Sequence, residues 1–271
     1  MSDSATIQAL KRRATTLRKH ILVPASVSFS HLGGAMSCAD IMAALFFHFL
    51  RFEDRNAQKR DRFLMSKGHA VTAFHACMVE LGKIDASELA TSGQSGSRLA
   101  GHPTMKAPGV EFGTGSLGHA LSVGVGIALA EQLNRSNSRT VVLLGDGELQ
   151  EGTVWEAALS APRFGLENLI AIVDYNHFQA AGNVDDIMPV DPLADKWRAF
   201  RWNVREIDGH DMSAIVGALA ALPAAHGPTA IIAHTVKGKG VPGIEGTGRA
   251  HYTMLTEEEV QSALALLEAG Q

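Results

Sequence analysis

The chain has 271 residues, 46% of them hydrophobic, and a formal net charge of −4 that is spread along the sequence rather than gathered into runs. No basic stretch with interleaved aromatic residues is present, which argues against a nucleic-acid partner. The sequence also lacks a run of about 18 apolar residues and the apolar region of a secretory signal, so we expect a cytoplasmic protein with no membrane partner.

The first part of the chain predicts helices around one short strand. Helical spacing of apolar residues runs over 5–22 and 38–50, "DRFLMS" at 61–66 has the character of a short buried strand, and a helix is expected from His69 to Leu81. Periodicity then disappears over residues 91–118, which hold seven glycines. A structureless loop of this length inside a compact domain is commonly functional, so we expect it to contribute to a site.

The two cysteines, Cys38 and Cys77, fall within these apolar helical segments. Two isolated cysteines in such surroundings indicate buried, reduced thiols rather than a disulfide or a metal site.

After a helix at 120–133, the chain repeats one unit, in which a strand with a polar end leads into a helix. The expected strands are 140–145, 169–176, 202–208 and 229–236, and the expected helices lie near 153–163, 191–200, 211–222 and 256–268. Continuous apolar strands that alternate with helices predict an α/β fold with a doubly wound, mainly parallel sheet and helices on both faces. No composition shift marks a linker, so we expect residues 1–271 to form one domain.

Two of the predicted strands end on oxygen-bearing side chains, Asp146 in "GDG" and Asn176 in "VDYN". Ligands of such sheets bind beyond the carboxyl ends of the strands. Mg²⁺ prefers oxygen ligands and commonly takes some of them from a phosphate, and Gly147 would let a backbone N–H approach that phosphate closely. "GDG" alone indicates only a tight turn, but its pairing with Asn176 predicts a metal and diphosphate site.

Eight short motifs extend this prediction over most of the chain. In order they are "HLGGAMSCADI", "SKGHA", "GHP", "GTGSLG", "GDGELQEG", "VDYN", "VKGKG" and "HY", and they run from His31 to Tyr252. Each motif is weak alone, but eight in this order make the chain resemble the transketolases. The resemblance implies the thiamine-diphosphate-binding fold.

The resemblance also implies which residues hold the cofactor. Asp146, Asn176 and the backbone carbonyl of Phe178 would bind Mg²⁺, or Ca²⁺ or Mn²⁺ in its place. The Gly147 N–H would bond the diphosphate of thiamine diphosphate. The cofactor rings would lie against the turn made by Gly115, Ser116 and Leu117.

Four histidines match positions that carry the sugar chemistry in the family: His31, His69, His102 and His251. Imidazole can donate to or accept from sugar hydroxyls near neutral pH. By the resemblance, His69 would touch both diphosphate and substrate, and the other three would line the ketose channel. We interpret His48 and His75, which lie in apolar helical stretches, as structural.

The sequence departs from the family pattern in two places. His119 stands where many relatives have glutamine, and it is either a fifth active-site imidazole or the first residue of a helix. Residues 243–250 lack the bulky residues that often precede the last histidine.

Charged residues near the motifs leave further alternatives open. Glu151 and Glu156 match acidic positions that connect two active sites in relatives, or they stabilise the start of a helix. Lys237 and Lys239 could help orient anionic groups, but exposed loop lysines are common, and we favour that interpretation.

The resemblance implies an enzyme that transfers a two-carbon ketol unit from a ketose, which we expect to be phosphorylated, to an aldose. Because the sequence ends at Gln271, soon after the last expected helix, we expect this enzyme to be made of two chains. We expect the pyrimidine-binding and C-terminal domains, with the glutamate that activates the pyrimidine, on a partner chain in an α2β2 assembly. The sequence does not identify the sugars.

Three other functions share features with this sequence. The α subunit of a 2-oxo-acid dehydrogenase shares "GDG" and asparagine but is not expected to carry "SKGHA", "GHP" or "VKGKG". A nicotinamide dehydrogenase is rejected, because "GTGSLG" at 113–118 does not follow a strand and lacks a suitably spaced acid. A non-catalytic regulatory subunit stays possible, although Asp146 and Asn176 are intact.

Overall fold

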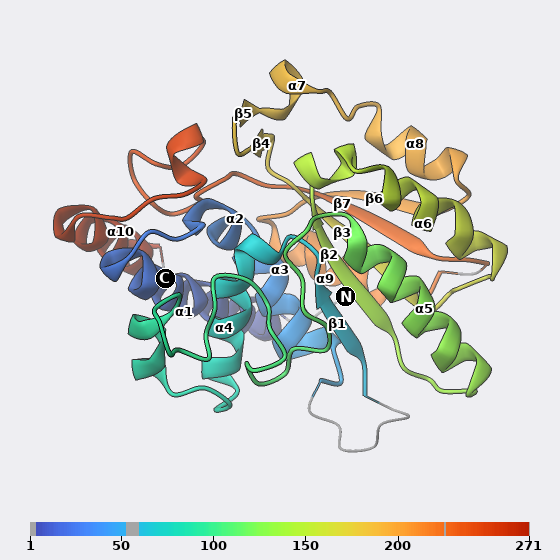
Figure 1. Ribbon diagram of the computed structural model, residues 1–271, viewed down its shortest axis with the longest axis horizontal. Coiled ribbons are helices and arrows are strands. Elements are labelled where there is room, and N and C mark those ends of the chain that lie inside the picture. The colour runs from blue at the N-terminus through green and yellow to red at the C-terminus, as the bar shows by residue number, and fades with distance from the viewer. Residues whose placement is uncertain (1–3, 53–59, 225, 271) are drawn as a thin grey trace.

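A five-stranded parallel sheet, in the order β1-β2-β3-β7-β6, forms the centre of the computed structural model, which describes residues 4–52, 60–224 and 226–270 (Figure 1). The strands are β1 (Arg62–Met65), β2 (Thr140–Gly145), β3 (Leu169–Tyr175), β6 (Asn203–Asp208) and β7 (Thr229–His234). Gly145 pairs with Asp174 and Tyr175 with His234, so the carboxyl ends of β2, β3 and β7 meet at one edge. The predicted parallel sheet is therefore confirmed.

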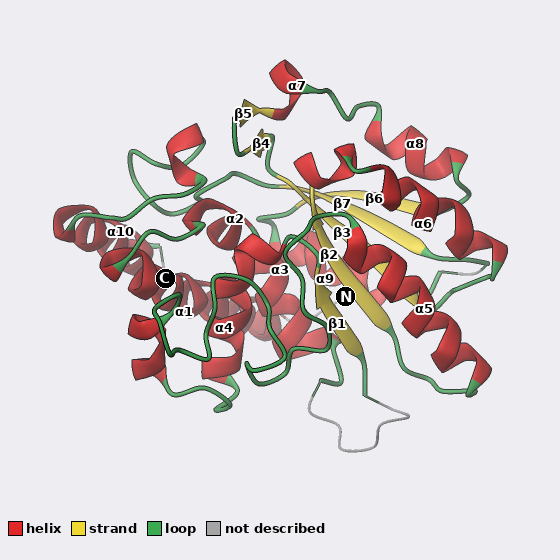
Figure 2. Ribbon diagram, viewed as in Figure 1, coloured by secondary structure: helices red, strands yellow, loops and turns green. Residues whose placement is uncertain are grey.

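Both faces of the sheet are covered by helices, which explains why its central strands are apolar throughout (Figure 2). Successive side chains of a strand point to opposite faces. Val141 and Leu143 accordingly belong to one hydrophobic core, whereas Val142 and Leu144 belong to the other. Alternation with polar residues would leave one core incomplete.

The helices divide between these two cores. The first core is packed by α1 (Ser4–Val27), α2 (Leu32–Ser37), α3 (Ala39–Ala44), α4 (Val71–Glu80), α9 (Met212–Ala220) and α10 (Glu257–Ala269). The second is packed by α5 (His119–Leu133), α6 (Gly152–Arg163) and α8 (Leu193–Ala199). Within the described ranges, no helix is long and apolar enough to cross a membrane.

The helix expected over 38–50 is present as α3 followed by a π-helical turn over Leu45–Phe49. The helix α2, which precedes it, was not predicted. Two glycines in α2 conceal it, because glycine is a poor helix former. Gly33 is needed for close approach, since a Cβ there would lie 2.5 Å from the carbonyl oxygen of Ala250.

The segment after β3 was also not predicted. It forms a small antiparallel hairpin of β4 (Phe178–Gln179) and β5 (Gly182–Asn183), followed by the short helix α7 (Val184–Ile187). Elements of two to four residues are too short to show a hydrophobic period.

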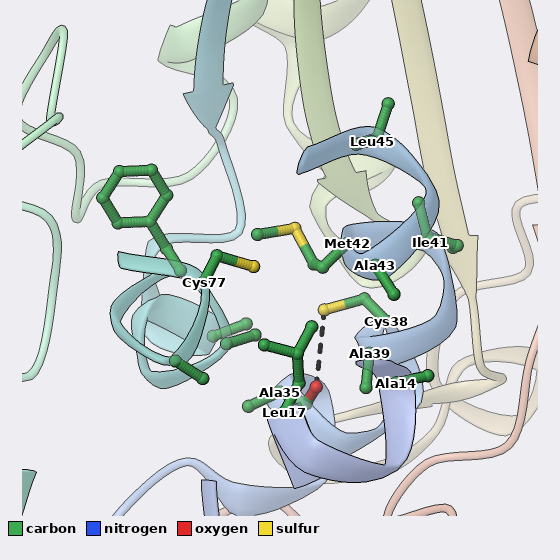
Figure 3. Close-up of a cluster of buried hydrophobic side chains, with 14 of the residues drawn as sticks. Ala14, Leu17, Ala35, Cys38, Ala39, Ile41, Met42, Ala43, Leu45 and Cys77 are labelled. Carbon is green, nitrogen blue, oxygen red and sulfur yellow. Dashed lines mark hydrogen bonds between the residues drawn. The ribbon is translucent and has the colours of Figure 1, made fainter. Parts of the chain in front are cut away.

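The two cysteines lie in the first core, as predicted (Figure 3). Cys38 and Cys77 are fully buried and unbonded to each other, and the Cys38 thiol lies 3.5 Å from the carbonyl oxygen of Ala35. Burial raises the pKa of Cys38 to about 12 and also raises that of Cys77. Both thiols are therefore protonated and unreactive.

The glycine-rich segment 92–118 crosses the carboxyl-end edge of the sheet as a loop without helix or strand. Its last part is held to the sheet by Thr114, whose hydroxyl donates to the carbonyl of Met65 at 2.7 Å. This anchor brings His102 and the turn at 115–117 toward the strand ends.

Candidate active site

The carboxyl ends of β2 and β3 place Asp146 and Asn176 on the wall of one cavity of about 320 Å³. Asp146 is 2% exposed, and its carboxylate accepts the backbone N–H groups of Gly147 (2.7 Å) and His177 (2.5 Å). His177 donates from a left-handed conformation, with φ of 64°. Burial, reinforced by nearby Asp174, raises the pKa of Asp146 to about 7. Two backbone donors thus hold a carboxylate at a strand end in place.

Asn176 is oriented by its neighbours at both ends of its amide. Its Nδ2 donates to Asp174 at 3.0 Å, and its Oδ1 accepts the N–H of Phe178 at 3.2 Å. The Phe178 carbonyl, the third expected metal ligand, accepts a hydrogen bond from Lys237 at 2.9 Å. Carbonyl oxygens have two lone pairs, so each retains acceptor capacity.

The donor set fits a hard divalent cation. One carboxylate, one amide oxygen and one peptide carbonyl are the oxygen ligands that Mg²⁺ and Ca²⁺ prefer. Within the described residues, no group of three or more His, Cys, Asp and Glu side chains could hold a metal by itself. A metal at this position would therefore depend on mixed oxygen donors completed by a phosphate.

Glycine is required beside this set. A Cβ at Gly147 would lie 2.8 Å from the Cβ of Gln179, which no real side chain tolerates without a shift. Gly147 lines the cavity together with Gly115 and Leu117 from the long loop. Ser116, between them, is exposed and does not line it.

A buried ion pair, one member of which (Lys67) lines the cavity, was not predicted from the sequence. Asp174 in β3 and Lys67, which follows β1, form a salt bridge whose side chains are 0% and 1% exposed. Asp174 also accepts from Ser37 (2.6 Å), Thr235 (2.5 Å) and Asn176. Burial would raise the pKa of Asp174, but Lys67, Ser37 and Thr235 together lower it, so Asp174 stays ionised and fixes the Asn176 amide.

Glu148 is a second buried carboxylate that was not predicted. It accepts the hydroxyl of Ser66 and the backbone N–H groups of Gly118 (2.8 Å) and Gly145 (3.0 Å). These partners come from the end of β1, the long loop and the end of β2. Glu148 therefore joins three segments that surround the cavity, and burial raises its pKa.

The four predicted histidines converge on the same cavity from four distant segments. The ring centroid of His31 lies 5.5 Å from that of His69, 5.6 Å from His102 and 5.3 Å from His251. Burial lowers the pKa of all four, to about 4 for His31 and His251. The rings are therefore neutral at pH 7, and each neutral ring can donate through one nitrogen and accept through the other.

The two lysines of "VKGKG" have different environments. Lys237 is 2% exposed, donates to Phe178, and lies 3.0 Å from Nδ1 of His251; burial lowers its pKa to about 8. Lys239 is partly exposed and pairs with Glu245 at 2.9 Å. The exposed-lysine alternative is thus wrong for Lys237.

The remaining candidates lie away from the cavity. His119 is exposed and begins α5, so it is a helix-start residue. His48 is exposed, and His75 is fully buried in α4. Glu151 and Glu156 are exposed at the start of α6, which leaves both of their interpretations open.

Comparison with known proteins identifies relatives along most of the chain. Residues 21–267 match the family described as transketolase, thiamine diphosphate binding domain. The chain is 38% identical over 262 residues to one subunit of an apulose-4-phosphate transketolase from Phocaeicola vulgatus, covering 95% of this chain and 93% of that protein. It is 39% identical over 264 residues to 6-deoxy-6-sulfo-D-fructose transketolase subunit SqwG of a Clostridium species, covering 96% of each.

Solved structures agree with these sequence relatives. The transketolase of Campylobacter jejuni superposes with a TM-score of 0.90 at 29% identity, over 99% of this chain and 43% of that one. The chain thus spans less than half the length of that solved transketolase, but nearly the whole length of the two transketolase subunits.

Proposed function

The chain belongs to the transketolase family, whose thiamine-diphosphate-binding domain it carries, and we propose that it acts with a partner chain to transfer a two-carbon ketol unit from a ketose to an aldose. The observation that carries the proposal is the convergence of strand-end oxygens and four neutral imidazoles on one cavity. The strand-end oxygens suit a cofactor's metal and diphosphate, and the imidazoles suit sugar hydroxyls.

Asp146, Asn176 and the Phe178 carbonyl would hold a divalent metal ion against the cofactor diphosphate. The support is their all-oxygen donor chemistry and the hydrogen bonds that orient each of them. The N–H of Gly147 would donate to the diphosphate, and Gly115 and Leu117, which line the cavity, would lie against the cofactor rings. When bound, thiamine diphosphate supplies the electron sink for cleaving the carbon–carbon bond.

The histidines would manage protons on the sugar. His69 lies close to the buried Lys67, since a Cβ at Gly34 would lie 3.1 Å from its Nε2 and 3.7 Å from the Lys67 ammonium. This position suits contact with both diphosphate and substrate. His31, His102 and His251, each neutral, would donate to or accept from ketose hydroxyls and carry a proton between them.

A second chain would complete the site. Its support is that two relatives covered along nearly their whole length are each named as one subunit of a transketolase. This partner would supply the glutamate that activates the pyrimidine, in an α2β2 assembly. We further propose that residues 1–271 form one cytoplasmic domain, which is supported by two cores that share one sheet.

For the donor we propose a ketose with an anionic group at its far end. The relatives are named for apulose-4-phosphate and 6-deoxy-6-sulfo-D-fructose, which carry a phosphate and a sulfo group.

Reconstitution tests the proposal. The chain purified with its partner should transfer ketol units only with thiamine diphosphate and a divalent metal, and either chain alone should be inactive. Removing the metal with EDTA should abolish turnover, and adding back Mg²⁺ should restore it. A reconstituted complex that binds thiamine diphosphate but transfers no ketol unit, or an active single chain, would contradict the proposal.

A further inference from the structure

The loop that follows β7 reaches the cavity through Lys237. The Lys237 ammonium donates to the carbonyl of Phe178 at 2.9 Å and lies 3.0 Å from Nδ1 of His251, and both of these partners line the cavity. The place of Lys237 therefore bears on a carbonyl proposed to bind the metal and on an imidazole proposed to contact the sugar.

The residues on either side of Lys237 are held by other segments of the chain. The N–H of Gly238 donates to the carbonyl of Gly33 at 3.1 Å. The N–H of Val236 donates instead to a side chain, at 2.9 Å to Nε2 of His210. His210 follows β6 and does not line the cavity, so a side chain outside the site holds the amide that precedes Lys237.

The bond from Val236 defines the tautomer of the His210 ring. A backbone N–H can only donate, so Nε2 accepts and carries no proton. The ring proton is therefore on Nδ1, which lies 2.8 Å from a carboxylate oxygen of Asp40. Because both nitrogens have a partner, the ring is fixed in orientation as well as in tautomer.

Asp40, in α3, is a charged and fixed acceptor for this ring. Its side chain is 11% exposed and accepts two hydrogen bonds from Arg18 of α1, at 2.6 and 3.2 Å. Burial would raise the pKa of Asp40, but Arg18 and His210 lower it to about 2. The carboxylate is thus ionised at neutral pH and cannot donate to Nδ1, which agrees with the tautomer that the Val236 amide requires.

The turn before His210 is shaped for this contact. The Gly209 N–H donates to the carbonyl of His234 at 2.7 Å, and a Cβ at Gly209 would lie 2.4 Å from Cγ2 of Thr235. Only glycine lets the turn lie this close to the end of β7. The sequence "DGH" at 208–210 therefore combines a glycine for close approach with a histidine for an acceptor.

We propose that His210 is a positioning residue for the transfer reaction, which sets the place of Lys237 by holding the N–H of Val236. This role rests on the proposed function and adds to it a residue outside the cavity. The ring presents Nε2 to the loop in one orientation, and the loop in turn holds the Phe178 carbonyl and the His251 ring. Without that acceptor the Val236 N–H loses its partner, and the ammonium is no longer held in place.

Two substitutions separate the two bonds of the ring. His210→Asn keeps an N–H near the position of Nδ1 but is too short to reach Val236, whereas His210→Gln reaches the position of Nε2 with an amide oxygen. Hydrogen exchange of the Val236 amide in the reconstituted complex should be at least about 10-fold faster in His210→Asn and should change less than about 2-fold in His210→Gln. His234→Asn, at the exposed end of β7, is the matched control and should also change it less than about 2-fold.

Calorimetric titration of thiamine diphosphate in the presence of Mg²⁺ measures the effect on the site without turnover. We expect about 10-fold weaker binding in His210→Asn, as for other residues that orient the ligands of a metal, and a change below about 2-fold in His210→Gln. In Lys237→Met, adding His210→Asn should weaken binding by less than about 2-fold more, because no ammonium is left to position. A merely structural role would give the same loss in both backgrounds.

Nitrogen NMR of isotope-labelled histidines in the full, unaltered chain tests the contact without a substitution, and it decides the matter if His210→Asn does not fold. At pH 7 His210 should carry a proton on Nδ1 and none on Nε2. A proton on Nε2, unchanged exchange of Val236 in His210→Asn, or equal weakening with and without Lys237 would overturn the positioning role. Absence of ketol transfer by the unaltered complex would instead count against the proposed function, and the exchange and NMR results do not depend on it.

Discussion

Two regions meet at the site and are built in opposite ways. The strand-end corner, made of Asp146, Asp174 and Asn176, is a set of polar groups that are held by protein donors. The histidine wall, made of His31, His69, His102 and His251, is held by ring contacts, and within the described chain one ring, His251, has a hydrogen-bond partner.

This difference in hydrogen bonding fits the different ligands that the two regions are proposed to bind. Groups that must keep one geometry for a metal and a diphosphate benefit from donors that fix them beforehand. Groups that must bind and release sugar hydroxyls need free donor and acceptor positions, which neutral imidazoles with few protein partners retain. Loss of a single hydrogen bond or ion pair is therefore expected to disturb the strand-end corner. The histidine wall is expected to be disturbed instead by substitutions that change the shape of its rings.

Asp174→Ala should have the largest effect on the corner. It leaves the ammonium of Lys67 buried without its carboxylate, which typically costs about 3–5 kcal/mol, and it frees the Asn176 amide. Urea unfolding should show this loss. Asp208→Ala, at the exposed end of the edge strand β6, is the matched control and should change the unfolding free energy by less than about 1 kcal/mol.

A second substitution separates the effect of the unpaired charge on stability from the effect of lost packing. Adding Lys67→Met to Asp174→Ala removes the unpaired charge and should recover part of the stability. If Asp174→Ala unfolds at the same urea concentration as the unaltered chain, the corner is not held by this pair.

Asp146→Asn should act on function more than on folding. It keeps the side-chain shape and an acceptor for the Gly147 N–H, but its amide nitrogen cannot accept from the N–H of His177. It also removes the charge proposed to bind the metal, so metal-dependent activity of the complex should fall about 10²–10³-fold. Calorimetric titration of thiamine diphosphate at increasing Mg²⁺ should show the lost metal dependence. Asp186→Asn, exposed on α7, should leave both measurements unchanged; unchanged Mg²⁺ dependence in Asp146→Asn would remove Asp146 from the metal site.

The corner was predictable from sequence because it follows local rules. Apolar strands that end in Asp146 and Asn176 predict both the sheet and the edge where ligands bind, and the structure has these strands in parallel register. The buried partners Lys67 and Glu148 were missed, because a charged residue near a motif is normally exposed. Their signal in the sequence was their position close to strand ends: Lys67 comes two residues after β1, and Glu148 comes three residues after β2.

The wall was accessible only through family resemblance. Nothing in the spacing of His31, His69, His102 and His251 brings them together, because each lies in a different segment and they meet only through the tertiary fold. The stacked rings of Phe29 and Tyr252 were missed for the same reason. The bridge of Ser30 with Thr253, which brings them together, joins segments that share no local pattern. Sequence patterns thus reveal groups placed by one element and miss those placed by contacts between distant elements.

His75 differs from both regions, because its ring has no hydrogen-bond partner among the residues that the structure describes. It is fully buried in α4, neither ring nitrogen has a hydrogen-bond partner among the described residues, and burial lowers its pKa from 6.5 to about 4. The unfolded chain binds the proton below pH 6.5, whereas the folded chain resists it until about pH 4. The contribution of His75 to the free energy of unfolding is therefore fully present above pH 6.5 and is lost as the pH falls, with a loss of about 2 kcal/mol at pH 5.

His75→Leu and His75→Gln should both flatten this dependence by the same amount, although their stabilities at pH 7 should differ, since only Gln leaves a polar group buried. The wall histidines with lowered pKa values also make the unfolding free energy fall at low pH, but they do so in all three proteins. The difference in pH dependence between the proteins therefore reports on His75 alone. Urea unfolding at pH 7 and pH 5 measures it. If the unfolding free energy falls by the same amount between pH 7 and pH 5 in all three proteins, His75 takes up its proton in the folded chain. The unpartnered imidazole of His75 would then not be the cause of the loss of stability at low pH.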